Sequence, residues 1–314
     1  MMVTTEQVEQ QNIQLQKELD SISKDIISRF PLSGYMNIIK SNSGLGKLSQ
    51  LKQAQKLRRA HEQIKSQYGT HALAIYLKLA LCCFISDSLE RLKHMKLTDE
   101  IVHLYHEWFE WVLEDFSKQP DDYYNHRSES FALDVKICSL RNIPVGGARI
   151  VEIRGVGLRP FYSGGVKQFF SYLYFILFKA RGFSPYISEH IVPRNLRHFN
   201  EHEMNLSYRR IVELMKLNPR IKGFYCRSWF LDPKLEDISP NLGYLRKVPL
   251  QNGAKLFAAG SAKKDIRPAL AMSAKRRRLY KEGKYLPTGY AYVWPRKEFL
   301  IFGTKYGLKE YRRR

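Results

Sequence analysis

The block YCRSWFLDP, residues 225–233, holds the residue types best suited to ligand chemistry. Its closing Asp-Pro pair is typical of a helix N-cap followed by a first helical residue, so capping accounts for that pair. Capping does not account for Arg227, Ser228 and Trp229. Ligands commonly bind beyond the carboxyl ends of strands in α/β sheets. We therefore expect Arg227, Ser228 and Trp229 to lie at a ligand site, with Arg227 and Trp229 as candidate substrate contacts.

A second candidate is the Glu189-His190 pair, in the middle of a strand-like segment from 187 to 192. Alternation along a strand places the two side chains on opposite faces. Histidine changes charge near neutral pH, so His190 is a candidate general base or acid. A hydrogen-bonded structural histidine is the alternative.

The segment RGVGLR, residues 154–159, is a basic, glycine-rich loop between a strand-like and a helix-like stretch. Backbone N–H groups at Gly155 and Gly157, with the side chains of Arg154 and Arg159, are suited to holding a phosphate. A plain turn is the alternative, because G-x-G without a fuller nucleotide-binding fingerprint is common.

Two histidine groups have spacings known from metal sites. Residues 198–202 spell H-x-x-E-H, which binds zinc only if both histidines share one helical face. Asn200 and Glu203 have the spacing of a helix start, which leaves the first histidine before the helix. His103 and His106 lie in an acidic helical stretch, where a solvated face is the favoured interpretation. We expect no metal site.

Basic and aromatic residues are interleaved near the carboxyl terminus. The run SAKRRRLYK, residues 273–281, contains Arg277 and Tyr280 and is followed by further cations and aromatics at 284–285 and 294–297. This pattern suits RNA, single-stranded DNA or a nucleotide. A helix paired with acidic residues elsewhere in the protein is an equally open interpretation.

The first third of the chain is predicted to be helical. Apolar residues at 15, 19, 22 and 26 form an amphipathic stripe that ends before Pro31. Further helices are predicted over 48–67, 70–93 and 98–116. A polar, breaker-rich segment at 117–130 predicts a boundary between a helical domain (1–130) and an α/β domain (131–314).

In the second domain, strand-like and helical runs alternate. Strands are predicted over 133–140, 148–153, 186–192, 221–231, 254–259 and 290–294. Helices are predicted from 164–165 to 182, over 200–217 and 266–282, with short helices after 232–233 and after 295. This alternation predicts a mixed-sheet α/β fold.

Composition narrows the class of protein. The 314 residues carry a net charge of +22 and are 44% hydrophobic, so the chain can bury a core and favours an anionic partner. That partner is a phosphorylated small molecule, a nucleic acid or an anionic membrane. Residues 261–314 contain 16 Lys or Arg and 4 Asp or Glu, whereas residues 87–134 contain 5 and 12, so internal pairing could use part of the charge.

The cysteines and the apolar runs bear on location. Four cysteines without a C-x-x-C pair favour a reducing cytoplasm over a disulfide framework. The polar segment 1–16 predicts no signal peptide, and the longest apolar runs are shorter than the roughly 20 residues of a membrane span. The sequence does not predict an oligomeric state.

The block at 226–233 resembles that of bacterial acyltransferases with a GNAT-like carboxyl-terminal domain. These have a similar Ser-Trp-aliphatic-Leu-Asp-Pro block, which follows a strand with a His-Ile-Pro-like turn and then a helix. The corresponding segments here are HIVP at 190–193 and the helix at 200–217. The resemblance covers about 187–245, and the family's helical amino-terminal domain is similar to residues 1–130. The R-x-x-G-x-G/A signature that binds the CoA pyrophosphate in GNAT proteins is absent before the 200–217 helix.

The resemblance implies a cytoplasmic bacterial enzyme that moves an acyl group from acyl-CoA to an amine or hydroxyl acceptor. His190 would be the base, Ser228 would polarise the carbonyl, Trp229 would shape the pocket, and Arg154 and Arg159 would meet phosphates. A splayed pair of parallel strands beside the 200–217 helix would support this interpretation, and a closed sheet would count against it.

Two further interpretations stay open. One is a non-catalytic nucleic-acid-binding protein that uses the basic carboxyl-terminal region. The other is a protein that docks on anionic membranes through the arginines at 276–278 and 312–314.

Overall fold

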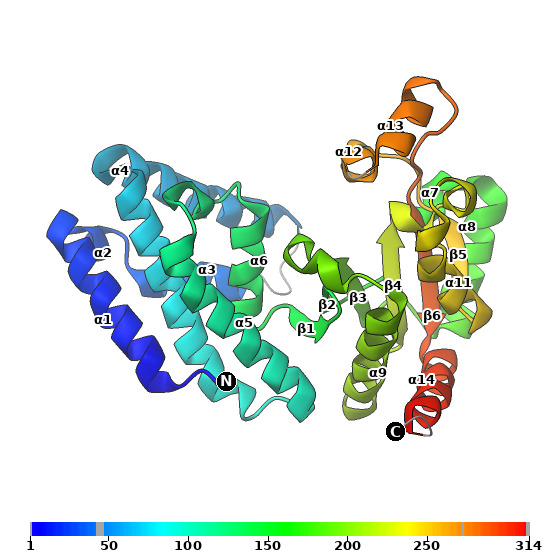
Figure 1. Ribbon diagram of the computed structural model, residues 1–314, viewed down its shortest axis with the longest axis horizontal. Coiled ribbons are helices and arrows are strands. Elements are labelled where there is room, and N and C mark those ends of the chain that lie inside the picture. The colour runs from blue at the N-terminus through cyan, green and yellow to red at the C-terminus, as the bar shows by residue number, and fades with distance from the viewer. Residues whose placement is uncertain (1, 42–46, 272, 312–314) are drawn as a thin grey trace. The chain divides into compact units, whose positions relative to one another are not determined.

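The computed structural model describes residues 2–41, 47–271 and 273–311. The chain divides into two compact units, Met1–Pro144 and Val145–Arg314, which are described separately (Figure 1). The first unit is helical in its described residues, apart from the start of a strand at its end, and the second contains a mixed six-stranded sheet. The expected combination of helical region and mixed-sheet region is confirmed. Residues 131–144, expected in the second domain, belong to the first unit.

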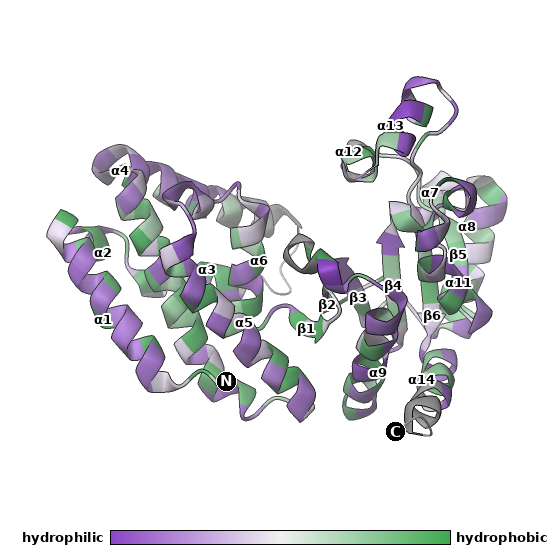
Figure 2. Cartoon of the chain, in the orientation of Figure 1, coloured by the Kyte–Doolittle hydropathy of each residue, from purple (hydrophilic) through white to green (hydrophobic). Residues whose placement is uncertain are grey.

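The first unit is built from helices joined by short turns. They are α1 (Thr5–Ile22), α2 (Ile26–Arg29), α3 (Leu32–Ser41), α4 (Lys47–Leu92), α5 (Asp99–Lys118), the 3₁₀ turn η1 (Asp121–Tyr123) and α6 (Glu129–Cys138). Thr4 begins α1 with a capping box that includes Gln7, and Thr98 caps α5 through the N–H of Ile101. Figure 2 shows hydrophilic residues along much of α1, whose apolar residues Leu15 and Leu19 are buried.

The core of this unit is the second half of α4. The helix changes direction at Gly69, where φ is +90°, a conformation that favours glycine, so the two predicted helices are confirmed as two segments. Residues 72–82 are buried throughout. Among the described residues, the segment Ala54–Leu92 is long and apolar enough to cross a membrane by composition, but 78% of its most apolar window is buried within the protein.

The predicted strand at 133–140 is wrong, because residues up to Cys138 belong to α6. Ser128 caps this helix by accepting the N–H of Phe131. Phe131, Val135 and Cys138 then recur at helical spacing and are buried. The apolar run in this segment fits both periods, and the upstream cap decides in favour of the helix.

The second unit is organised around one sheet. Its strands are β1 (Ile143–Gly146), β2 (Arg149–Arg154), β3 (Tyr186–Ile191), β4 (Gly223–Ser228), β5 (Lys255–Ala258) and β6 (Tyr290–Pro295), in the order β1-β2-β3-β4-β6-β5. The unit boundary falls within β1. The pairs β2–β3, β4–β6 and β5–β6 are antiparallel, whereas β3 and β4 are parallel.

Helices cover both faces of the sheet (Figure 1). The helices and helical turns of this unit are α7 (Pro160–Ser163), α8 (Gly165–Tyr174) with the π-helical turn η2 (Phe175–Lys179), η3 (Pro193–His198), α9 (Glu201–Leu217), η4 (Trp229–Leu231), α10 (Leu235–Ile238), η5 (Pro240–Leu242), α11 (Tyr244–Gln251), α12 (Lys263–Ala271), α13 (Ala274–Lys281) and α14 (Arg296–Tyr311). On one face, Tyr172 of α8 packs in a cluster with Tyr225 and Val293. On the other, Tyr208 of α9 packs edge-on against Phe224 and Trp294.

Two details differ from the predicted helices. The single helix predicted over 266–282 is two helices, because Ser273 caps α13 by accepting the N–H of Arg276 and so starts a new helix there. Asp232 does not cap the helix directly. Its carboxylate accepts the N–H of Lys234 in a turn, and α10 begins one residue later.

Candidate functional site

The central feature of the second unit is the separation of β3 from β4. These parallel strands pair only where Ile187 and Ser188 face Phe224 and Tyr225. Beyond this point β3 continues to pair with β2, and β4 with β6, but the two strands no longer pair with each other. A cavity of about 160 Å³ lies between them, lined by the last residues of both strands. The sheet is therefore splayed at its centre, beside α9, which begins shortly after β3.

Backbone chemistry follows from this splay. Each residue of a strand carries an N–H and a C=O that a neighbouring strand normally satisfies. At Glu189–Ile191 and Cys226–Ser228 the inner edges of the two strands face the cavity instead of each other. A ligand between the strands can accept and donate hydrogen bonds along both edges, in the manner of an added strand.

His190 lies at this cavity and is held by a carboxylate. Its Nε2 is 2.8 Å from Oε1 of Glu152, which also contacts Nη1 of Arg154 at 2.8 Å. The His190 side chain is 41% exposed, so it is accessible. When Nε2–H donates to Glu152, Nδ1 carries the lone pair. A carboxylate that fixes the tautomer and orientation of a histidine is the arrangement found in catalytic triads.

Glu189, on the opposite face as expected, forms a buried ion pair. Its Oε1 lies 2.6 Å from Nε of Arg149, and the two side chains are 7% and 0% exposed. Arg149 also donates from Nη1 to the carbonyl oxygen of Gly147 at 2.9 Å and lies 4.9 Å from the ring centroid of Phe199. The pair joins β2 to β3 at the edge of the cavity. The sequence did not predict this ion pair, because its only sign there is one basic and one acidic residue in two otherwise apolar strands.

The same face of the cavity is closed by hydroxyl and thiol groups. The hydroxyls of Tyr208 and Tyr292 lie 3.0 Å apart. Burial raises the pKa of both phenols well above the ordinary value, and burial likewise raises the pKa of the Cys226 thiol. All three groups stay protonated near neutral pH. Cys226 therefore lines the cavity as a thiol and does not act as a nucleophile.

Arg227 and Ser228 are at the cavity, and each has a structural partner. Arg227 donates from both Nη atoms to the carboxylate of Asp265 in α12, at 3.1 and 2.6 Å, and both side chains are nearly buried. Ser228 accepts the N–H of Phe230 and so caps η4. Its hydroxyl hydrogen can still be donated. The Arg227 guanidinium anchors α12, which reduces its capacity to hold a substrate.

The glycines of the 154–159 loop are explained by packing. A Cβ on Gly157 would collide with the hydroxyl of Tyr225, and one on Gly155 would lie 3.2 Å from the carbonyl oxygen of Phe183. The N–H of Val156 donates to that same carbonyl. Arg154 and Arg159 remain as half-exposed cations. Arg154 contacts Glu152, the carboxylate partner of His190, and Arg159 lies 4.0 Å from Asp265, the partner of Arg227. Both arginines therefore lie on the His190 face of the sheet.

The remaining predicted substrate residues lie outside the cavity. Trp229 is buried in a cluster with Leu235, Ala269 and Tyr285, and the guanidinium of Arg276 lies over its ring at 4.8 Å. Arg277 donates to the last carbonyl groups of α12, those of Leu270 and Ala271.

Tyr280 is an exposed residue of α13. The helices α12 and α13 lie beyond the carboxyl end of β4 (Figure 1). Of the three consecutive arginines at 276–278, Arg276 and Arg277 have the structural contacts described above.

The histidine pairs do not form metal sites in the described part of the chain, where no group of three or more His, Cys, Asp or Glu side chains is placed to hold an ion. Asn200 caps α9, as expected, so His198 lies in η3 and not on the helix that carries His202. His103 is exposed and pairs with Glu107 at 3.2 Å.

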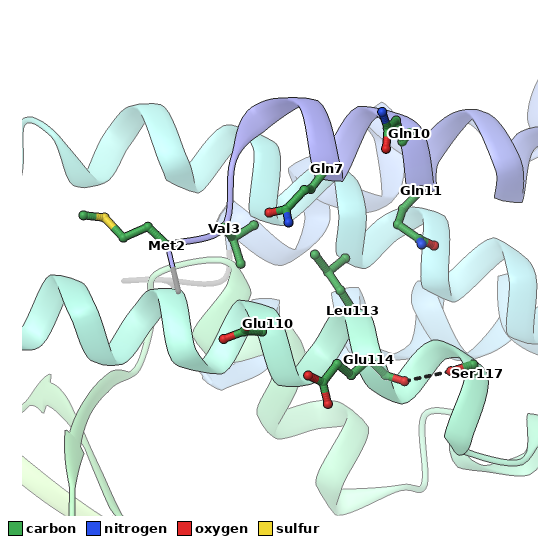
Figure 3. Close-up of a pocket in the computed structure, with 9 residues that line it drawn as sticks. All are labelled: Met2, Val3, Gln7, Gln10, Gln11, Glu110, Leu113, Glu114 and Ser117. Carbon is green, nitrogen blue, oxygen red and sulfur yellow. Dashed lines mark hydrogen bonds between the residues drawn. The ribbon is translucent and has the colours of Figure 1, made fainter.

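The first unit has cavities of its own. The one drawn in Figure 3, of about 390 Å³, lies between the start of α1 and the end of α5. It is lined by amide and carboxylate side chains with Met2, Val3 and Leu113, and Ser117 donates to the carbonyl oxygen of Glu114 beside it. No lining residue is a histidine, cysteine or cation. The cavity between the splayed strands is the stronger candidate site, because there His190 is paired with a carboxylate and lies beside Ser228.

Comparison with protein-family models, with curated proteins and with solved structures finds no match for this chain.

Proposed function

We propose that the second unit is an acyltransferase of GNAT-like type, which moves an acyl group from a CoA-type thioester to an amine or hydroxyl. The observation that carries this proposal is the splay of β3 and β4 beside α9, with His190 and Glu152 at its edge. The His-Ile-Val-Pro segment begins in β3 and leads out of it toward α9, and the Ser-Trp-Phe-Leu-Asp-Pro segment begins at Ser228, the last residue of β4. These features support the proposal.

In this mechanism the thioester lies between the strands. The nitrogen or oxygen of the acceptor attacks the carbonyl carbon, and its proton passes to Nδ1 of His190, which Glu152 orients from the other side. The carbonyl oxygen gains negative charge and takes hydrogen bonds from strand-edge N–H groups or from the Ser228 hydroxyl. The C–N or C–O bond forms, the C–S bond breaks, and the departing thiolate takes up a proton.

The donor's phosphates have no glycine-rich loop at the start of α9, where GNAT proteins bind them. Arg154 and Arg159 are half-exposed cations on the His190 face, and we assign them as the alternative anchor. The N-terminus of α9 is capped by the Asn200 side chain and carries Glu201 and Glu203 in its first turn, so an anion is disfavoured there.

The test measures protein-dependent release of free CoA thiol from acetyl-CoA and from longer acyl-CoA esters, with mixed amines and peptides as acceptors. Mass spectrometry identifies any acylated product. General-base catalysis contributes about 10²- to 10⁴-fold, so His190→Ala lowers kcat by a factor in this range. Glu152→Gln keeps a hydrogen-bond acceptor but loses the charge, and we expect a smaller loss.

His198→Ala is the matched control, because His198 is an exposed histidine in η3 and not a residue of the cavity. It leaves turnover unchanged. Equilibrium dialysis with CoA separates binding from chemistry, since His190→Ala retains CoA binding and Arg154→Gln weakens it. A protein that neither binds CoA nor releases its thiol refutes the proposal, as does full activity in His190→Ala.

A further inference from the structure

The helix α8 and the turn η2 present an unusual number of apolar side chains to solvent. Val166, Phe170, Tyr174 and Phe178 are each between 54% and 73% exposed, and Tyr162 of α7 precedes them. They are spaced four residues apart, which stacks side chains along one face of a helix. The rings of Tyr174 and Phe178 lie 5.1 Å apart, so the stripe continues into η2. These residues are called the α8 stripe below.

The α8 stripe is held in place from behind. Tyr172 of α8 and Ile176 of η2 are fully buried in a core cluster with residues of the sheet. The Tyr172 hydroxyl donates to the carbonyl oxygen of Gly157 at 2.8 Å. The Gln168 side chain donates to the carbonyl oxygen of Ala258 and accepts the N–H of the same residue. The exposure of the stripe is therefore a fixed property of a docked helix and not the result of fraying at its ends.

The charge around the α8 stripe has one sign. Residues 153–188 contain five Lys or Arg and no Asp or Glu. Lys167, Lys179 and Arg181 are exposed beside the stripe, and Arg154 and Arg159 are half-exposed at the strand end before it. The face thus combines aromatic and aliphatic side chains with a cationic border.

We propose that this face docks on an anionic lipid surface. Phe, Tyr and aliphatic side chains bordered by Lys and Arg are the composition of helices that lie in the plane of a membrane interface, with the apolar face buried by about 5–10 Å. Lys and Arg add attraction to anionic headgroups. The α8 stripe contains none of the residues that line the cavity between β3 and β4, and only Arg154 and Arg159 of its cationic border are shared with the proposed donor site.

A second copy of the chain fits the charge less well. A symmetric dimer apposes the same patch on both subunits, so the five cations of one face would meet those of the other. Like charges brought together across an interface cost several kcal/mol. An anionic lipid surface removes this repulsion and supplies the opposite charge.

The experiment mixes the full chain with sucrose-loaded vesicles and measures the sedimented fraction. One set is phosphatidylcholine alone, and in the other about a third of the lipid is phosphatidylserine. We expect binding to the anionic vesicles that weakens with added salt. Phe170→Ser/Phe178→Ser lowers the partition coefficient at least tenfold, because each aromatic side chain loses its transfer into the interface. The matched control is Leu286→Ser, a half-exposed leucine outside the stripe, which leaves binding unchanged.

The charge arm uses Lys167→Gln/Lys179→Gln/Arg181→Gln, which weakens binding to anionic vesicles and leaves the fold intact by circular dichroism. All these positions are exposed, so the variants are expected to fold. Absence of binding to either vesicle overturns the proposal. Binding that the Phe170→Ser/Phe178→Ser variant does not reduce overturns it too. Sedimentation equilibrium without lipid is the third readout: self-association abolished by that variant would assign the stripe to a second copy.

Discussion

The buried ion pair between Arg149 and Glu189 lets the free-energy cost of breaking one contact at the cavity be estimated. The two side chains are 0% and 7% exposed and their charged atoms lie 2.6 Å apart. Arg149→Met leaves the Glu189 carboxylate without its cation in a site that water barely reaches. Breaking a buried pair by removing one partner costs about 3–5 kcal/mol. The lost hydrogen bond to Gly147 places the cost toward the upper end.

The second substitution separates charge from packing. Arg149→Met/Glu189→Leu replaces both charges with apolar side chains, and such replacements of buried pairs are often close to neutral. We expect the double variant to recover at least half of the free energy of unfolding that Arg149→Met loses. Urea unfolding followed by tryptophan fluorescence and circular dichroism measures each variant at pH 7, with the dependence on urea concentration checked for constancy.

The matched control is the exposed pair Lys216–Glu213, in the same unit and at a similar distance of 2.7 Å, whose side chains are half-exposed. Lys216→Met changes the free energy of unfolding by less than about 1 kcal/mol, because exposed pairs contribute little. Equal losses in Arg149→Met and in the double variant would refute the reasoning, since the loss would then come from packing and not from a stranded charge.

Three further predictions concern single residues. Burial, assisted by the charge of His126, lowers the pKa of His61 to about 4, whereas the histidine of the unfolded chain has a pKa near 6.5. As the pH falls, the unfolded state therefore binds this proton first, and the free energy of unfolding falls by about 2–3 kcal/mol between pH 6.5 and 4. His61→Phe removes this pH dependence in urea titrations, and the exposed His94→Phe does not. Gly157→Ala lowers the free energy of unfolding by about 1–3 kcal/mol, measured by thermal unfolding, because the added Cβ would collide with the Tyr225 hydroxyl. Gly34→Ala stabilises the protein, because Gly34 lies inside α3 and an added Cβ there would have no neighbouring group within 4 Å. In a chain with only Cys226 left, a thiol reagent at pH 8 reacts only after unfolding, because burial raises the pKa of that thiol; fast reaction of the native protein would contradict the buried position.

Local patterns predicted most of the elements. Asn200 caps the helix that its spacing from Glu203 indicated, the helix predicted from residue 98 begins at the cap Thr98, and alternation placed Glu189 and His190 on opposite faces. The errors arose where one apolar run fits two periods, as at 133–140, or where a cap lies inside a helical pattern, as at Ser273. In both cases a single hydroxyl bonded to a backbone N–H decides the outcome.

The site was harder to predict, because it depends on partners far apart in the sequence. Glu152 meets His190 across 38 residues, and Asp265 meets Arg227 across another 38. No local pattern indicates which carboxylate a given cation or histidine will meet. Trp229 was expected at a ligand because it follows the end of a strand, but its side chain is buried in the hydrophobic core.

The splay between β3 and β4 also bears on how the second unit folds. Strands β1 to β3 come from residues 143–191 and strands β4 to β6 from residues 223–295, so each half of the sheet is contiguous in the chain. Each half can form its own antiparallel ladders, β2–β3 and β4–β6–β5, within one contiguous segment of the chain, and contacts that are closer in sequence form faster. The two halves then meet along a seam of only two residue pairs, with α9 between them in sequence. Such a seam forms late and opens at little cost, so the amide hydrogens along it exchange with solvent before those of the ladders on either side.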